Sequence, residues 1–153
     1  MSNTCTIEGL KAGDRPFLLE SILDVLQETY PEFKGVGRIE QRERAEALIA
    51  RYAQTPGSAS VLCLDGERAG MIWWLEEWHP VTEERLALIL LVRVAPEYRR
   101  RGLGRTLLEH AQTEAKAEGI EHLRLFANPD NHPAFELYRS LGFRPKIAEL
   151  HWQ

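Results

Sequence analysis

Apolar side chains follow a helical period over two stretches in the first third of the chain. The first stretch spans residues 19–26, between Asp14, which can cap a helix, and Pro31, which would end one. The second spans residues 45–52 and stops before a Pro-Gly pair. A short extended segment over residues 5–10 precedes both. This part of the chain therefore predicts a strand followed by two helices.

The pattern then becomes extended. Residues 60–64 and 69–78 flank Asp65-Gly66, a strong signal for a hairpin turn. Residues 86–94 form a continuous apolar run rich in branched side chains, which is typical of a buried central strand.

Helical spacing returns in the last third and alternates with extended segments. The expected elements are a helix from about 103 to 119, a strand over 122–127, a helix from 133 to 142 and a strand over 146–152. The order β-α-α-β-β-β-α-β-α-β predicts an α+β (mixed α/β) fold on one central sheet, formed as a single domain by residues 1–153.

Length and composition narrow the class of protein. The 153 residues, 44% of them hydrophobic and 27% charged, are typical of one globular domain. A net charge of −4 argues against a nucleic-acid partner. Two cysteines make neither a disulfide framework nor a zinc site. No signal peptide is recognisable, and no apolar run approaches the ~18 residues that span a membrane. We expect a cytoplasmic protein with no metal and no membrane partner.

Positive charge gathers where the central strand leads into the following helix. Five arginines and one glutamate lie between residues 93 and 105, and this segment contains Arg99-Arg100-Arg101-Gly102-Leu103-Gly104-Arg105. Backbone N–H groups at a helix N-terminus form an anion site that the helix dipole strengthens. Gly102 and Gly104 let a phosphate approach the backbone, and the arginines add charge-assisted hydrogen bonds. The pattern indicates a pyrophosphate site.

Two familiar phosphate-binding loops do not fit this segment. A P-loop ends in Gly-Lys-Ser/Thr, whereas Gly104 is followed by Arg105-Thr106. A dinucleotide fingerprint needs a third glycine where this chain has Leu107. A helix start with a solvated arginine face explains the two glycines equally well, so the segment alone leaves that alternative open.

Two motifs together resemble the GNAT N-acetyltransferase superfamily. Residues 99–104 match its (Gln/Arg)-x-x-Gly-x-(Gly/Ala) signature. Residues 131–143, Asn-His-Pro-Ala-Phe-Glu-Leu-Tyr-Arg-Ser-Leu-Gly-Phe, resemble its Asn-x-x-Ala-x-x-Leu-Tyr-x-x-x-Gly-Phe pattern. The resemblance covers residues 92–143. It implies a central mixed, mostly antiparallel sheet with about four helices, and strands that splay apart at the cofactor site.

The resemblance further implies that acetyl-CoA is the co-substrate. The backbone of Val92, Arg93 and Val94 would pair with the pantetheine arm like an added strand. Backbone N–H groups of residues 99–105 would hold the pyrophosphate. Asn131 would hydrogen-bond the pantetheine, and Ala134 of the same motif is expected in the cofactor site.

The same resemblance implies direct transfer of acetyl to a primary amine in a ternary complex, without an acyl-enzyme. The departing thiolate has a conjugate pKa near ~8.5, so the phenol of Tyr138 can protonate it. Tyr138 also fits a helix core stripe. A general base or a chain of water to bulk solvent must take the proton of the amine. The candidate bases are Glu76, Glu77, Glu83 and Glu84, and Glu84 is preferred if the central strand begins early enough to include it. A solvated loop is the alternative for Glu84.

The acceptor amine and the oligomeric state are less defined by the sequence. Trp74 and Glu76 share a strand face, and an aromatic ring beside a carboxylate suits a cationic amine. Sheet packing or a dimer surface explains them equally well. A homodimer is a reasonable expectation for a small enzyme. The alternative function is a non-catalytic module that binds acyl-CoA or a protein partner.

Overall fold

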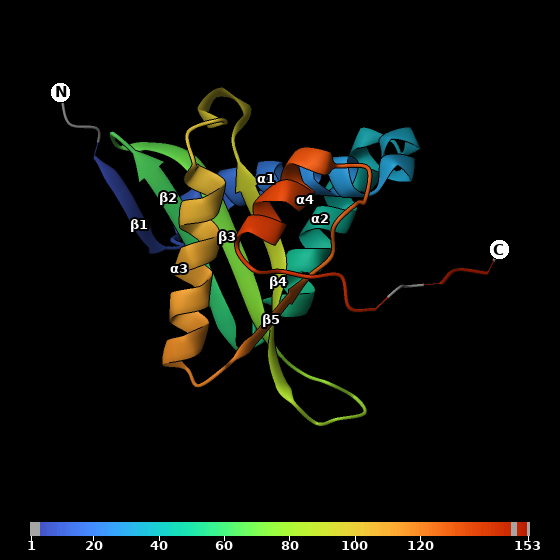
Figure 1. The fold of residues 1–153 in the computed structure, drawn as a ribbon. Coiled ribbons are helices and arrows are strands. Elements are labelled where there is room, and N and C mark those ends of the chain that lie inside the picture. The colour runs from blue at the N-terminus through green and yellow to red at the C-terminus, as the bar shows by residue number, and fades with distance from the viewer. Residues whose placement is uncertain (1–3, 148–149, 153) are drawn as a thin grey trace.

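The computed structural model describes residues 4–147 and 150–152, which form a five-stranded sheet with two layers of helices (Figure 1). In chain order the elements are β1 (Cys5–Gly9), α1 (Arg15–Thr29), α2 (Arg38–Tyr52), β2 (Gly57–Leu64), β3 (Glu67–Trp78), β4 (Arg85–Val94), α3 (Leu103–Ala117), β5 (His122–Leu125) and α4 (His132–Ser140). Three 3₁₀ turns join them: η1 (Ala12–Asp14), η2 (Pro31–Gly35) and η3 (Pro96–Tyr98).

The sheet follows the chain order β1-β2-β3-β4-β5, and the expected mixed, mostly antiparallel arrangement is confirmed. Strands β1 to β4 are antiparallel, while β5 runs parallel to β4 after the crossover through α3. The predicted hairpin joins β2 to β3. Asp65 and Gly66 both have positive φ there, at 52° and 83°, as the two central residues of a type I′ turn require.

Each face of the sheet carries its own apolar core. Helices α1 and α2 cover one face, and α3 and α4 cover the other (Figure 1). Neighbouring residues of β3 divide between the two cores, because successive strand side chains point to opposite faces. Trp73 packs with α1 and α2, whereas Trp74 packs with α3.

Strand β4 is interrupted by a bulge at its centre. Trp74 pairs with Ile89 and Trp73 pairs with Leu91, so Leu90 is an extra residue without a partner in β3. The pairing with β5 ends at the same place, because the last of its four residue pairs joins Ile89 to Leu125. Beyond Ile89 the edge of β4 has no partner in β5, as the expected splay at the cofactor site requires.

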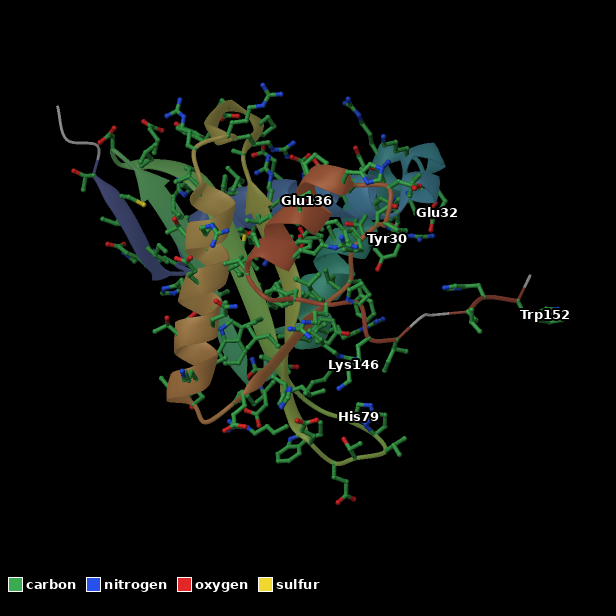
Figure 2. The ribbon with its side chains drawn as sticks, in the orientation of Figure 1. Tyr30, Glu32, His79, Glu136, Lys146 and Trp152 are labelled. Carbon is green, nitrogen blue, oxygen red and sulfur yellow. The ribbon has the colours of Figure 1, made fainter. Side chains whose placement is uncertain are left out.

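The C-terminal strand expected over residues 146–152 is not seen in the part of that segment that the structure describes. Residues 146–147 and 150–152 are irregular, and residues 148–149 lie outside the described residues. The side chains of Ile147, Leu150 and Trp152 are 78%, 91% and 97% exposed, so they contribute nothing to the core. Figure 2 shows Trp152 well away from the helices and the sheet.

No helix within residues 4–147 and 150–152 is long and apolar enough to cross a bilayer. The longest ones, α1, α2 and α3, have 15 residues each.

Candidate functional site

Strand β4 leads through η3 into a loop that opens helix α3, and this loop has the geometry of an anion site. Arg100 and Gly102 adopt positive φ, at 66° and 75°, and Gly102 is the N-cap of α3. The next three residues, Leu103, Gly104 and Arg105, form the first turn of the helix. Their N–H groups have no carbonyl partner within the helix, so they are free to bind an anion.

The two glycines of this loop serve different purposes. A Cβ on Gly102 would meet nothing within 4 Å, so glycine is favoured at this position by the left-handed backbone and not by lack of space. A Cβ on Gly104 would lie 3.1 Å from Leu137 Cδ2 on α4. Gly104 therefore lets α3 and α4 pack closely, a purpose that the sequence motif alone does not reveal.

Most arginine side chains of the loop are engaged by protein groups. Arg99 Nε donates to the Val94 carbonyl oxygen at 3.0 Å, and its Nη2 donates to Glu28 on α1 at 2.9 Å. The Arg101 guanidinium stacks over the Tyr98 ring, 5.6 Å from its centroid. Arg105 donates to the Ser140 hydroxyl on α4 at 2.5 Å. The backbone N–H groups thus remain the main donors for an anion.

Arg93 turns its side chain away from the splayed strands and into the core under α1. Its guanidinium donates to Asp24 at 2.5 Å and to the Ser21 hydroxyl at 3.2 Å, and it lies 3.5 Å from Glu20. The side chain is 2% exposed, and its Nε is buried without a partner. The Arg93 side chain is therefore held by groups of α1, and the expected role of Arg93 in cofactor binding concerns its backbone.

Three carboxylates of α1 hold the two arginines at either end of this region. Glu20, Asp24 and Glu28 recur every four residues, so they lie on one side of the helix. The first two face Arg93, and the third binds Arg99. The i, i+4, i+8 spacing of these three carboxylates is visible in the sequence, but the arginines that they contact lie about 70 residues further along the chain.

Tyr138 lies half-buried on α4, with its ring edge-on to Phe143 at a centroid distance of 6.1 Å. Burial raises the pKa of the Tyr138 phenol above its usual range, and the Glu28 carboxylate adds to this effect. The phenol therefore stays protonated over the physiological pH range and can donate a proton.

Asn131 and Ala134 form the start of α4. The Asn131 Oδ1 accepts a hydrogen bond from the Ala134 N–H at 3.3 Å and so caps the helix. The carbonyl of the Asn131 amide is occupied in this way, which leaves its NH₂ group as the donor that a ligand could use.

Glu84, the expected base, lies at the other end of β4. The strand begins at Arg85, so Glu84 precedes it, and its carboxylate contacts His122 Nε2 at 2.9 Å. Six strand positions separate Glu84 from the bulge at Leu90, a path of ~20 Å. In Figure 2 His79, in the same loop as Glu84, lies at the lower end of the molecule, whereas Glu136 of α4 lies near the upper end.

Trp74 and Glu76, the expected acceptor residues, are likewise held by other partners. Trp74 is buried beneath α3, and its indole N–H donates to Glu114 at 3.3 Å. Glu76 makes two hydrogen bonds with Arg85, at 2.9 and 3.0 Å, and these lower the pKa of the Glu76 carboxyl. Trp74 and Tyr138 both belong to the core on the α3 side of the sheet, whereas Glu76 is paired with Arg85.

These features define a class of fold: a mixed sheet whose parallel pair of strands ends early, beside a glycine-containing loop that opens a helix. The chain belongs to the acetyltransferase (GNAT) family, whose model matches residues 19–143.

Several proteins with related sequences or structures are described as acetyltransferases. The chain is 44% identical over 57 residues to the [ribosomal protein bS18]-alanine N-acetyltransferase of Escherichia coli K12, which is 37% of this chain and 38% of that protein. The matched stretch thus spans less than half the length of this relative. A GCN5-related N-acetyltransferase from Ralstonia eutropha JMP134 has the same fold, with a TM-score of 0.73 and 22% identity over 99% of both chains. A protein from Clostridium acetobutylicum, described as a predicted acetyltransferase with acetyl-CoA, has a TM-score of 0.76 and 16% identity over 98% of this chain and 96% of its own.

Proposed function

We propose that this protein transfers the acetyl group of acetyl-CoA directly to a primary amine, with both substrates bound together. The observation that carries the proposal is the end of the β4–β5 pairing at Ile89. The edge of β4 that β5 leaves unpaired ends at Val94, and the left-handed Gly102 and the N-terminus of α3 follow within ten residues. An amide-bearing arm and a pyrophosphate at its end match this arrangement.

In this proposal the cofactor lies along the end of β4 and across the first turn of α3. The backbone of Val92, Arg93 and Val94 pairs with the pantetheine amides. The N–H groups of residues 99–105 bind the pyrophosphate, helped by the dipole of α3. The Asn131 amide donates to the pantetheine, and Ala134 packs beside it.

The chemical step needs a proton donor at the sulfur. The amine nitrogen attacks the thioester carbon, the carbon–sulfur bond breaks, and Tyr138 Oη gives its proton to the departing sulfur. The proton that the amine loses passes to water, and Tyr138 is reprotonated from water after CoA leaves. Glu84 lies too far along β4 to take that proton directly, and its contact with His122 supports a structural role instead.

The cofactor part of the proposal is tested by thermal unfolding with and without acetyl-CoA. At about 100 times the dissociation constant the ligand stabilises the fold by ~2.7 kcal/mol, which raises Tm by several degrees. NADH and ATP serve as control ligands, and an equal shift with either would contradict a site built for acetyl-CoA.

The anion site is tested with Gly102→Glu, because a carboxylate there would repel the pyrophosphate. Gly119 is a matched control: it lies at the other end of α3 and has nearly the same φ, 77° against 75°. We expect Gly102→Glu to abolish the acetyl-CoA shift and Gly119→Glu to retain it. Both variants carry a similar backbone strain. A full shift with Gly102→Glu would overturn the assignment of the α3 N-terminus.

Turnover is measured as CoA release with a panel of primary amines. The panel includes peptides with an N-terminal alanine, since the Escherichia coli relative is a ribosomal-protein-alanine N-acetyltransferase. Acetyl-CoA binding without CoA release for any amine would favour a non-catalytic acyl-CoA-binding module over the enzyme.

A further inference from the structure

A cavity lies on the face of the sheet that α1 and α2 cover. Its volume is about 530 Å³, within the range of small-molecule pockets. The cavity opens between η1 with the start of α1 and the end of α2, above β2 and β3. Ala59 and Trp73, which are paired across β2 and β3, both line it. The proposed acetyl-CoA site lies between β4 and β5 and on α3, none of which lines the cavity, so the two sites are separate.

The wall of the cavity is mostly apolar. Leu18 and Trp73 form part of the core and are almost fully buried, and Leu10, Ile49 and Tyr52 add partly buried surface. An apolar body bound here would remove this surface from water, at a gain of about 25 cal/mol for each Å² buried.

The charged side chains of the lining all have the same sign. Lys11 and Arg15 line the cavity, and no aspartate or glutamate is present among the described residues that do. Lys11 contacts Glu8 at 3.0 Å, and Arg15 contacts Glu46, but both acids lie outside the lining. These pairs are exposed, so each holds its cation only weakly. A ligand anion can replace the acids at little cost.

We propose that this cavity binds an amphipathic monoanion: a carboxylate that lies between Lys11 and Arg15, with an aliphatic or aromatic body against Trp73. Two cations beside an apolar wall on a chain of net charge −4 form a local exception to the overall charge. They favour an anionic head group over a neutral one and exclude a cationic one.

The experiment uses three ligands with one body and different head groups: octanoate, octanol and octylammonium. Binding is followed through the indole N–H signals in ¹H–¹⁵N spectra of the full chain, without acetyl-CoA. Trp78 and Trp152, which are 62% and 97% exposed, report any non-specific association. We expect octanoate to shift the Trp73 signal saturably, octanol to bind more weakly, and octylammonium to leave it unchanged. The Trp78 and Trp152 signals should stay in place.

Three variants separate the charge contribution from general packing. Lys11→Gln and Arg15→Gln should each weaken octanoate binding by about threefold or more. Arg44→Gln, which removes an exposed arginine paired with Glu40 outside the cavity, should leave the binding unchanged. Equal binding of octanol and octanoate, or shifts confined to Trp78 and Trp152, would overturn the proposal. The result does not depend on the acetyltransferase proposal, because neither acetyl-CoA nor an acceptor is present.

Discussion

At the scale of single residues, burial determines what the phenol of Tyr138 can do. Its pKa lies above the usual range, so titration of this group does not limit a reaction at neutral pH. We predict that Tyr138→Phe lowers kcat by about 100-fold, a typical contribution of a positioned proton donor. The KM for acetyl-CoA should change little, because only a hydroxyl is lost. Steady-state kinetics with a reactive amine from the panel measure both.

Tyr98→Phe is the matched control for this variant. Tyr98 is a second phenol near the cofactor loop, but it belongs to η3 and its ring lies under Arg101. It should keep the wild-type rate. A Tyr138→Phe rate within twofold of wild type would mean that the thiolate leaves without the phenol's proton.

Side-chain roles at this scale were only partly predictable. The motifs identified a backbone anion site, because an N–H group is present whatever the side chain. They did not predict that Gly104 allows contact with Leu137, or that Arg93 turns into the core. Both depend on partners that come close only when the sheet and helices have assembled.

At the scale of elements, α1 fixes the position of β4 through a buried charge. Asp24 is the closest carboxylate to the Arg93 guanidinium, which is almost fully buried. We predict that Asp24→Asn lowers the free energy of unfolding by about 2–4 kcal/mol, because it leaves a buried cation short of a partner. Urea denaturation followed by circular dichroism measures the change.

Glu20→Gln provides the comparison on the same helix. Glu20 lies 3.5 Å from Arg93 and is 64% exposed, so its removal should cost less than about 1 kcal/mol. Equal losses for the two variants would show that the effect comes from the helix and not from the buried pair.

The junction between β1 and α1 carries a pH-sensitive contact. Asp14 accepts hydrogen bonds from the Lys11 N–H at 2.9 Å and from Arg68 Nε at 2.7 Å. Arg68, followed by the Lys11 N–H, lowers the pKa of the Asp14 carboxyl below its usual value. A lowered pKa in the folded state stabilises the fold above the unfolded pKa and loses that stabilisation as the pH falls through the folded value.

We therefore predict that Asp14→Asn is less stable than wild type near pH 7, by about 1–3 kcal/mol. The difference should shrink as the pH falls below about 4 and vanish once Asp14 is protonated in both states. Thermal unfolding of both proteins between pH 2.5 and 7 gives the comparison. A difference that is constant across this range would assign the loss to packing instead of charge.

At the scale of the whole molecule, periodicity predicted the elements well where one period held over a long stretch. The amphipathic helices and the Asp65-Gly66 hairpin follow from local spacing and local turn geometry. The turn η2 had no such signal, and residues 146–152 alternate as a strand would. Alternation alone does not provide a neighbouring strand to pair with, and the described part of that segment has none.

For the candidate site, strand alternation predicts which face a side chain lies on but not where it lies along the strand. Alternation predicts that neighbouring strand residues lie on opposite faces, and Trp73 and Trp74 do so. Alternation gives no information on position along a strand. It therefore does not show that Glu84 lies at the opposite end of β4 from the expected cofactor residues Val92, Arg93 and Val94. The relative positions of residues along neighbouring strands depend on the pairing register. Trp78 pairs with Arg85, and Gly70 pairs with Val94.

The bulge at Leu90 means that the number of residues in β4, and not only their identity, determines the shape of the strand. Without Leu90, Ile89 and Leu91 would still pair with Trp74 and Trp73 and keep their present faces. The shortened protein should therefore fold with both cores intact, yet lose the local bend that separates β4 from β5.

We predict that deletion of Leu90 retains cooperative unfolding but abolishes the acetyl-CoA shift in Tm. Deletion of Val92 instead would turn Arg93 toward α3, away from its carboxylates, and should prevent folding. Deletion of Leu90 would thus show that acetyl-CoA binding requires a residue of β4 that folding does not require.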